Sequence, residues 1–379
     1  MALALHDKIG FDITRGICIS LRKLNPISEK WAMFGGGHPV PNEQSLSAAQ
    51  ACFELLEEAN QKEALVIFAV SGGGSAMLEW PIDAEITLAD LQEANRILVN
   101  CGATISEVNV VRRSFSAVKG GQLAALIPKA QIVTLIISDT NPGDEASVAS
   151  GPSLVAPDSE LSALQIVQKY QLEAKLPQTI LRAINGPQQK VFPHPNHNHF
   201  VLADNRTAVQ AAVVAASAMG FRTIVTDDIC EQEISDGCAQ LLSRLQAEAP
   251  PVCLISGGEF SCAVRGDGRG GRNIETVLRC AMGLDQWSED AVIISKATDG
   301  LDGNSRVAGA IADNTTMERG RALGLDAGEF LARSDSFNYL ESLQDTFGWG
   351  PTHTNVRDIR VLIKTARDTD AGLEIHNFI

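Results

Sequence analysis

Several signatures that would place a protein in a common class are missing from this 379-residue chain. Its eight cysteines contain no C-x-x-C pair, and most of them lie within apolar runs. No apolar run is long enough to span a bilayer, and the N-terminus does not have the build of a signal peptide. These features favour a cytoplasmic protein with buried free thiols, and they argue against a membrane protein.

Positive charge is scarce, because 31 Lys and Arg residues face 46 Asp and Glu residues, for a formal net charge of −15. This balance argues against nucleic acid or an anionic membrane as the main partner, since both attract cationic surfaces. An anionic small molecule would have to be bound at a local cluster of positive charge. The composition leaves the oligomeric state open, homo-oligomers included.

Common catalytic fingerprints are missing as well. The glycine-rich turn at 71–75 is not followed by Gly-Lys-Ser/Thr and does not have the spacing G-x-G-x-x-G, and no G-x-S-x-G occurs. His194, His197 and His199 share a polar loop, but they lack the spacing of zinc ligands and have no cysteine or carboxylate nearby. The sequence therefore argues against a P-loop enzyme, a serine hydrolase and a zinc protein. The spacing of the turn at 71–75 also argues against a dinucleotide-binding oxidoreductase.

Short apolar segments rich in Val and Ile alternate with amphipathic segments along the chain. The apolar segments lack strict alternation of polar and apolar residues, which suits strands buried on both faces of a sheet. This order predicts an α/β fold with mainly parallel sheets and helices on both faces. We expect strands at residues 64–70, 132–137, 200–203, 223–226, 252–256, 291–295 and 359–363, and helices at 45–60, 88–101, 160–170, 206–219, 233–247, 273–282 and 315–323.

The length of the chain predicts two domains, since one hydrophobic core seldom supports so many residues. Pro250-Pro251 separates a predicted helix from a predicted strand. We therefore expect the boundary there, with domains at 1–249 and 250–379.

Glycine, arginine and acidic residues that can bind a charged ligand are concentrated between residues 256 and 303. Glycines there let backbone N–H groups approach an anion, and arginine grips a carboxylate or phosphate with two parallel hydrogen bonds. Aspartates can hold Mg²⁺ beside phosphates. Together these residues predict a site for a small, highly charged substrate. The segments are Ser256-Gly257-Gly258-Glu259, Gly268-Arg269-Gly270-Gly271-Arg272-Asn273 and Thr298-Asp299-Gly300-Leu301-Asp302-Gly303.

Arg272 follows two glycines and precedes Asn273, which we expect to cap the helix that carries Glu275. A guanidinium and a helix N-terminus would then converge on one anion, so a binding role is favoured over an ordinary surface arginine. Asp299 and Asp302 have two interpretations, a Mg²⁺ site or an Asx-type turn.

Two segments nearer the N-terminus are candidates for phosphate binding, each with a structural alternative. The turn Ser71-Gly72-Gly73-Gly74-Ser75 follows a predicted strand and is either an anion cradle or a tight turn. Arg112, Arg113 and Lys119 form the densest basic cluster, which lies either on phosphate or on a solvated helix face.

Asp139, Asp144 and the segment Ser150-Gly151-Pro152 follow another predicted strand, at the edge where open α/β sheets bind ligands. Asp139 is a candidate Mg²⁺ ligand, whereas Asp144 is suited to capping a loop. The last candidates precede the final predicted strand, where they either bind a ligand or form a capped turn: Thr352, Thr354 and Asn355.

Taken in order, these motifs resemble the glycerate 2-kinase family, whose C-terminal part is described as the MOFRL domain. Each motif is weak alone, but the ordered set is specific and covers the chain from about residue 6 to residue 364. The matching segments are residues 38–41, 71–75, 109–121, 149–152, 256–259, 270–273, 298–303, 308–310 and 350–356.

The resemblance implies an enzyme that transfers phosphate from ATP to the 2-hydroxyl of D-glycerate with Mg²⁺. It also implies two three-layer α/β/α lobes with the active site in the cleft between them. The N-terminal lobe (1–249) would be Rossmann-like and the C-terminal lobe (250–379) MOFRL-like. Family members are also labelled hydroxypyruvate reductases, so an oxidoreductase is one alternative. A non-catalytic relative that binds nucleotide or another anion is the other.

On this resemblance, Arg272, Lys119 and Asp299 are the catalytic candidates, and Asp139 and Asp299 position Mg²⁺. Arg272 would hold the glycerate carboxylate or the transferring phosphoryl group, while the turn at 71–75 and Lys119 would hold the ATP phosphates. No residue is an evident base for the hydroxyl. The remaining candidates for binding substrate or nucleotide are Arg112, Ser150, Gly151, Glu259, Asn273, Glu275, Thr352, Thr354 and Asn355.

The chain departs from the family pattern in several places. The family carries a Gly-Lys-Ala-Ala segment with an active-site lysine upstream of the first match, and this chain begins after it. Arg306 replaces a family aspartate, Phe260-Ser261 replaces Thr-Thr, and His353 stands where glycine is frequent. Without the lysine, we expect the chain to keep its fold and some ligand binding but to turn over glycerate weakly or not at all.

Overall fold

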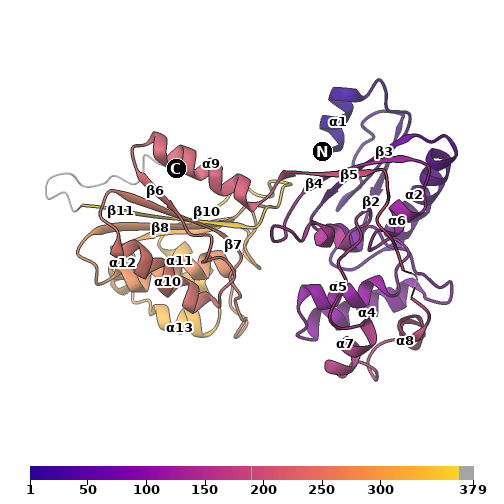
Figure 1. Ribbon diagram of the computed structural model, residues 1–379. Helices are drawn as coiled ribbons and strands as arrows, with labels where there is room; N and C mark the ends of the chain where they lie inside the picture. The colour runs from indigo at the N-terminus through magenta and orange to yellow at the C-terminus, as the bar shows by residue number, and fades with distance from the viewer. Residues whose placement is uncertain (189, 367–379) are drawn as a thin grey trace. The chain divides into compact units, whose positions relative to one another are not determined.

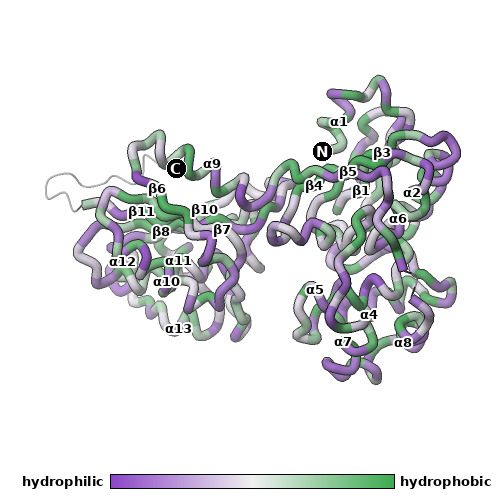
Figure 2. The backbone as a smooth tube through the Cα atoms, in the orientation of Figure 1, coloured by the Kyte–Doolittle hydropathy of each residue, from purple (hydrophilic) through white to green (hydrophobic). Residues whose placement is uncertain are grey.

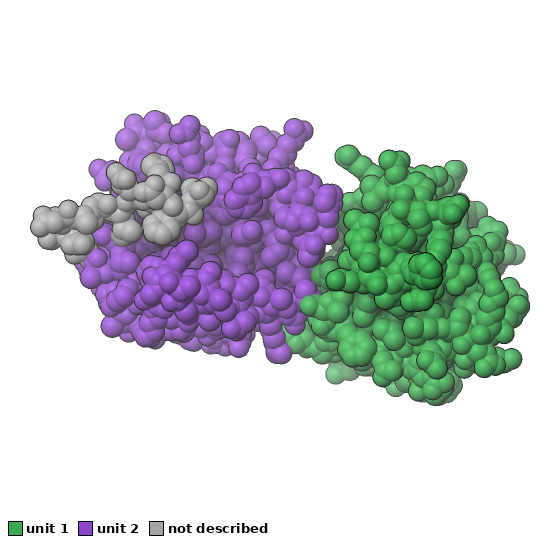
Figure 3. All heavy atoms as spheres, turned by 90° about the horizontal axis from the view of Figure 1, so that it is seen from above, with its two compact units in different colours: residues 1–202 green, residues 203–379 purple. Residues whose placement is uncertain are grey.

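A computed structural model describes residues 1–188 and 190–366. The chain forms two compact units, Met1–Leu202 and Ala203–Ile379 (Figure 3). This division lies earlier in the chain than the predicted boundary before Pro250. The reason is that β6 (Arg222–Val225) pairs in parallel with β7 (Val252–Gly258), so the segment after residue 203 belongs to the second unit.

The first unit contains two small sheets and a group of helices (Figure 1). β1 pairs in parallel with β2, and β4 lies between β3, to which it is parallel, and β5. The elements are α1 (Ala2–Ile9), β1 (Gly16–Ser20), β2 (Trp31–Gly35), α2 (Glu43–Gln61), β3 (Leu65–Ser71), α3 (Gly74–Met77), α4 (Leu88–Asn100), α5 (Ile105–Arg113), α6 (Gln122–Ala125), β4 (Gln131–Ile137), η1 (Glu145–Ser150), α7 (Ala163–Lys169), α8 (Gln178–Asn185) and β5 (His197–Ala203).

Local sequence signals start the helices of this unit. Capping boxes, in which the cap side chain and the third helical residue exchange hydrogen bonds, begin α2 at Asn42, α4 at Thr87, α5 at Thr104 and α7 at Ser162. α4, α5, α7 and α8 then bury their apolar faces against one another in a separate core. This packing fixes α5, the helix that carries Arg112.

The three-stranded sheet of the first unit is covered unevenly. Ile132 and Ile136 of β4 are buried, and Ile132 packs with residues of α2 and α6. Val133 and Leu135, on the opposite face of the same strand, are only half-buried. The expected burial on both faces is therefore not seen for β4, because its buried positions alternate along the strand.

The second unit contains a single six-stranded sheet in the order β10-β9-β8-β11-β7-β6. α9 packs on one face, against β6, β7 and β11, while α10 and α11 pack on the other (Figure 1). The elements are α9 (Asn205–Ala218), β6, α10 (Ile234–Ala247), β7, α11 (Arg272–Leu284), β8 (Asp290–Ala297), β9 (Gly309–Asp313), α12 (Thr316–Ala322), α13 (Ala327–Ala332), α14 (Ser336–Ser342), β10 (Thr346–Phe347) and β11 (Asp358–Thr365).

The α/β fold class is confirmed, and helices cover both faces of the second sheet. Parallel pairing holds for β1–β2, β3–β4 and β6–β7, but β11 runs antiparallel to both β7 and β8. β8–β9 and β9–β10 are also antiparallel. The second sheet is therefore mixed. Its central strands, β8 and β11, have apolar middles and charged residues towards their ends. Hydropathy along the chain (Figure 2) does not show in which direction a strand runs.

No helix built by residues 1–188 and 190–366 combines the length and the apolarity that crossing a membrane requires. All eight cysteines are free thiols, as predicted. Only Cys238, Cys253 and Cys280 are fully buried, and burial raises the pKa of Cys253 to about 11. The other five cysteines are partly exposed.

Candidate active site

A cavity of about 350 Å³ opens in the second unit where several predicted segments meet. Its lining comes from the N-terminus of α11, the loop after β8 and the residue that begins β11. Two of the three glycine-rich segments identified in the sequence, 268–273 and 298–303, contribute to it directly. The polar and charged side chains in the lining are Arg272, Glu275, Asp299, Asp302, Asn304, Ser334, Asn355 and Asp358.

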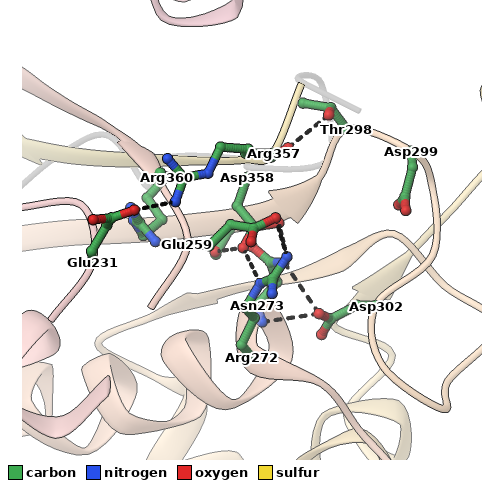
Figure 4. A network of polar contacts seen from close by, with 12 residues as sticks. Glu231, Glu259, Arg272, Asn273, Thr298, Asp299, Asp302, Arg357, Asp358 and Arg360 are labelled. Atoms are coloured by element: carbon green, nitrogen blue, oxygen red, sulfur yellow. Dashed lines mark hydrogen bonds and ion pairs between the residues drawn. The ribbon is translucent and has the colours of Figure 1, made fainter. Parts of the chain in front are cut away.

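Arg272 is gripped by two carboxylates at this cavity (Figure 4). Its Nε donates to Asp358 Oδ2 at 2.5 Å, and its Nη2 donates to Glu259 Oε1 at 2.6 Å. Burial alone lowers the pKa of Arg272, but Asp358 and Glu259 outweigh it and raise the pKa above its usual value. The guanidinium is therefore permanently charged and held in a fixed plane.

The two carboxylates differ in their access to water. The Asp358 side chain is 1% exposed, whereas that of Glu259 is 29% exposed and that of Arg272 is 35% exposed. Removing Asp358 from Arg272 would leave a buried charge unpaired, which is costly. Glu259 is thus the more exposed of the two partners, and its pair with Arg272 is less shielded from water.

Asp302 occupies the N-terminus of α11. Its Oδ1 accepts from the backbone N–H of Asn273 at 3.1 Å, and its Oδ2 accepts from that of Ile274 at 2.8 Å. Burial raises the pKa of Asp302 to about 6, against the lowering effect of these two backbone hydrogen bonds. A carboxylate of the protein therefore already fills the position where we expected a bound anion.

The predicted capping role of Asn273 is wrong. The helix starts one residue earlier, with Gly271 as its cap, and Asn273 lies inside the first turn. Its side-chain amide donates to Asp302 Oδ1 at 3.1 Å and accepts from Ser295 Oγ at 2.6 Å. A charged carboxylate from the loop after β8 satisfies the helix N–H groups better than a neutral amide, so Asn273 is used to hold that loop.

Asp299 and Glu275 line the cavity, and their carboxylates also accept hydrogen bonds from the protein. Asp299 Oδ1 accepts from the backbone N–H of Leu301 at 3.0 Å, which forms the Asx-type turn that was one of its two interpretations. Glu275 Oε1 accepts from Arg279 at 2.7 Å and 2.9 Å, one helical turn along α11. Asp299 is therefore the better placed of the two for an added ligand.

Magnesium has one candidate ligand at this cavity. Within residues 1–188 and 190–366, no three His, Cys, Asp or Glu side chains are grouped as a ready-made metal site. Mg²⁺ often binds one or two carboxylates and completes its shell with water and substrate phosphates. Asp299, whose carboxylate lines the cavity, fits such a site.

The loop before β11 forms a capped turn. Thr352 Oγ1 donates to the carbonyl of Thr298 at 2.6 Å and accepts from the N–H of Thr354 at 3.3 Å. Asn355 Oδ1 accepts from the N–H of Arg357 at 2.9 Å. The structural alternative for these residues is thus formed. Asn355 also lines the cavity, while Thr352 and Thr354 are outside its lining.

In the first unit, the glycine turn lies beside the segment around Ser150. Ser75 Oγ donates to Ser150 Oγ at 2.7 Å, and Ser150 Oγ donates in turn to Asn109 Oδ1 at 2.9 Å. Gly73 has a φ of +79°, and Ala149, Ser150 and Gly151 are also left-handed. Such strained backbone persists only where the surroundings enforce it, and it is concentrated at functional sites.

Asp139 and Arg112 lie near this turn. A side chain at Gly72 would overlap the carboxylate of Asp139, so the two are in close contact. Arg112 is 7% exposed, and its Nε is buried with no hydrogen-bond partner. Burial lowers the pKa of Arg112, and the charge of Glu79 opposes that shift. Arg112 therefore does not lie on a solvated helix face.

Lys119 is enclosed in the protein. Its Nζ donates to Glu79 Oε2 at 2.5 Å, and the two side chains are 2% and 1% exposed. Ser116 Oγ donates to the other oxygen of Glu79 at 2.5 Å. Burial lowers the pKa of Lys119 while Glu79 opposes that shift. Because its ammonium is already paired and shielded from water, Lys119 is poorly suited to bind ATP phosphates.

Sequence reasoning gave no individual role to three polar residues that organise these regions: Asp358, Glu79 and Asn109. Each bonds a residue far away in the chain, as Glu79 does with Lys119, 40 positions later. Asp358 begins a strand with an apolar middle, and Glu79 follows a short apolar stretch. Neither environment is a sequence signal for an ion pair, so only the fold reveals their partners.

Two family models match separate parts of this chain, one in each unit. Residues 1–185 match a domain of unknown function, DUF4147, and residues 252–358 match the MOFRL family. The crystal structure of the glycerate kinase of Thermotoga maritima superposes with a TM-score of 0.81 at 30% identity, covering 96% of this chain and 88% of that one. These matches define a two-unit α/β protein whose second unit contains a MOFRL domain.

Two similar proteins indicate the family to which this chain belongs. The glycerate 2-kinase of Pyrococcus horikoshii is 32% identical and aligns with 97% of this chain and 85% of its own length. A protein of Agrobacterium vitis that is provisionally named a hydroxypyruvate reductase is 36% identical over 86% of each chain. The chain belongs to the glycerate 2-kinase family.

Proposed function

We propose that this protein transfers a phosphoryl group from ATP to the 2-hydroxyl of D-glycerate. The observation that carries the proposal is Arg272, which lines the cavity and is held by buried Asp358 and by the more exposed Glu259. Membership of the glycerate 2-kinase family supplies the reaction class. The cavity supplies a place for a small anion.

In this proposal Arg272 binds the carboxylate of D-glycerate or the transferring phosphoryl group with its planar fork. The anion takes the place of Glu259, and Asp358 keeps the guanidinium oriented while the exchange occurs. Phosphoryl transfer depends mainly on positioning and charge neutralisation, so a fixed arginine at the anion is what the reaction requires.

The nucleotide and the metal ion have candidate contacts of their own. The turn at 71–75, with its left-handed Gly73, offers backbone N–H groups to the phosphates of ATP. Asp299 offers a carboxylate to Mg²⁺, which when bound would neutralise charge on those phosphates. The free thiols fit a reducing compartment, so we place the protein in the cytoplasm.

A dehydrogenase function has less support, although one relative is provisionally named a hydroxypyruvate reductase. In common dinucleotide-binding sites, a G-x-G-x-x-G turn joins a strand directly to a helix whose N-terminus binds the pyrophosphate. The glycines at 266, 268 and 271 have this spacing, but β7 already ends at Gly258. The first N–H groups of the helix after them, α11, are occupied by Asp302.

The test is product formation under single-turnover conditions, with enzyme in excess over D-glycerate, so that a slow reaction is still detected. We expect 2-phosphoglycerate from ATP, Mg²⁺ and D-glycerate, and no NADH oxidation with hydroxypyruvate. Arg272→Lys should abolish most of the product. Arg279→Lys is the matched control, because Arg279 lies on the same helix and pairs with Glu275 instead. NADH oxidation without phosphorylated product would contradict the proposal.

A further inference from the structure

The side chain of Asn205, at the start of α9, joins the ends of two strands. Its Oδ1 accepts from the backbone N–H of Gly258 at 2.8 Å. Its Nδ2 donates to the carbonyls of Val356 at 2.7 Å and Asp358 at 2.9 Å. One amide therefore satisfies three backbone groups, from the end of β7, the beginning of β11 and the loop just before β11.

These strand ends carry the carboxylates that grip Arg272. Gly258 and Asp358 are directly opposite each other in the last antiparallel pair between β7 and β11. Glu259 follows Gly258 in the chain, and the carboxylate of Asp358 bonds Arg272 Nε. Asn205 thus spans the rung of the sheet from which both partners of Arg272 project.

The amide also accounts for a glycine in the motif Ser256-Gly257-Gly258-Glu259. A side chain at Gly257 would overlap Asn205 Oδ1. Gly257 is therefore needed so that the helix carrying Asn205 can approach the strand closely. Gly257, which the sequence motif contains, and Asn205, which the sequence did not mark, are therefore in direct contact.

We propose that Asn205 is a positioning residue for the reaction: it sets the separation of Glu259 and Asp358 and thereby the plane of Arg272. This inference rests on the proposed function for its kinetic consequence. Asn205 is absent from the cavity lining and acts through backbone groups. Without its two donors, the carbonyls of Val356 and Asp358 lose their partners and the ends of the strands separate. A displacement of about 1 Å at a reacting group can cost about a hundredfold in rate.

Asn314 provides a matched control within the same unit. Its Oδ1 accepts from the N–H of Ala291 at 2.7 Å, and its Nδ2 donates to the carbonyls of Leu284 at 3.1 Å and Glu289 at 3.2 Å. It makes the same three kinds of bond and is half-buried like Asn205. Asn314 follows β9, and its partner Ala291 lies at the beginning of β8. The residues of β8 and its following loop that line the cavity come from the other end of that strand.

The experiment compares Asn205→Ala, Asn205→Asp and Asn314→Ala in the full chain. The Asp variant keeps the shape and the acceptor of Asn205 but removes both donors. The first measurement is the ¹⁵N-resolved Nε–H resonance of Arg272 and its exchange with solvent. The second is the rate of 2-phosphoglycerate formation. Melting temperatures show whether Asn205→Ala and Asn314→Ala are destabilised alike.

We expect both Asn205 variants to accelerate exchange of the Arg272 Nε–H by at least tenfold and to lower kcat/KM by about tenfold to a hundredfold. Asn314→Ala should leave both quantities within about twofold of wild type. The loss in Asn205→Ala should also be non-additive with Arg272→Lys, since the two act as one unit.

The inference is overturned if Asn314→Ala changes the Arg272 resonance as much as Asn205→Ala does, or if neither changes it. It is also overturned if both Asn205 variants unfold, because Asn205 would then be a general determinant of the fold. If no protein forms 2-phosphoglycerate, the proposed function fails, and the resonance of Arg272 still decides the role of Asn205.

Discussion

Two cations with carboxylate partners, one in each unit, show how differently a protein can use the same pair of charges. Lys119 and Glu79 form a closed pair with both side chains almost fully buried. Arg272 is about one-third exposed and is shared between buried Asp358 and partly exposed Glu259. Both cations lie in glycine-rich motifs of the sequence, and from the sequence both were candidates for anion binding.

The difference follows from the chemistry of the side chains. An ammonium is a compact charge, and the ammonium of Lys119 is enclosed with one buried carboxylate, so Lys119 is part of the protein interior. A guanidinium is a planar fork, and one edge can be anchored while another changes its partner. Access of the second carboxylate to water, more than the positive charge itself, therefore separates a candidate binding site from a structural ion pair.

The largest expected effect is the loss of stability when the ion pair between Lys119 and Glu79 is broken. Glu79→Gln should destabilise the protein by about 3–5 kcal/mol, because it leaves the ammonium of Lys119 buried without a counter-charge. Urea unfolding followed by tryptophan fluorescence measures this loss. Glu58→Gln is the control, since Glu58 pairs with Arg15 and Lys62 at the surface and should matter little. A cost below about 1 kcal/mol for Glu79→Gln would show that Lys119 is not enclosed.

The next largest expected effect is a dependence of stability on pH that comes from Asp302. The pKa of Asp302 is about 6 in the folded protein and near 3.8 in the unfolded chain. As pH rises from 4 to 6, the unfolded chain loses this proton first, so the folded state should lose roughly 2 kcal/mol of stability from this group. Asp302→Asn has no such titration. The difference in unfolding free energy between wild type and Asp302→Asn should therefore fall over this range; a constant difference would contradict the burial of a titrating Asp302.

A smaller loss is expected for Asp358→Asn than for Glu79→Gln. The variant keeps an acceptor near Arg272 Nε, and Arg272 retains both Glu259 and contact with water. We expect a cost of about 2 kcal/mol, the scale of one hydrogen bond to a charged group. Urea unfolding measured beside Glu79→Gln tests the ranking. If Asp358→Asn costs more, the guanidinium is the less adaptable of the two cations.

Helices and buried strands could be predicted from local patterns in the sequence. All seven predicted strands occur in the structure, and α2, α4, α9 and α10 begin and end within two residues of their predicted bounds. Capping residues such as Asn42 and Thr87 act on their own helices, so the signal and the structure lie together. The strands β1, β2, β9 and β10 were not predicted, and each is at most five residues long.

The long-range arrangement could not be predicted in the same way. A strand such as β11 does not show in its sequence that it runs antiparallel between β7 and β8. Nor does the sequence show that β6 joins the second sheet, which moves the division between the units to residue 203. The glycines and Arg272 marked the cavity, but Asp358 and Asn205 depend on contacts across more than fifty residues.

The smallest expected effect is on the glycine turn of the first unit. Gly73 has a φ of +79°, so Gly73→Ala should cost about 1 kcal/mol of stability through backbone strain, although a Cβ there would meet His38 only at an ordinary contact distance. If the turn binds ATP phosphates, the same change should weaken ATP binding by calorimetry. Gly102→Ala, also left-handed and with open space around it, controls for strain alone. Equal ATP affinity in all three proteins would leave the turn purely structural.

The most direct test of the contrast between the two cations is the affinity for D-glycerate, measured by calorimetry on wild type, Arg272→Lys and Lys119→Met. Lysine at position 272 cannot span two carboxylates and an anion with one planar fork, so binding should weaken by about 1.5–3 kcal/mol. Lys119→Met should lower stability yet leave the affinity of the folded protein unchanged. Unaltered binding in Arg272→Lys, or lost binding in folded Lys119→Met, would contradict the account.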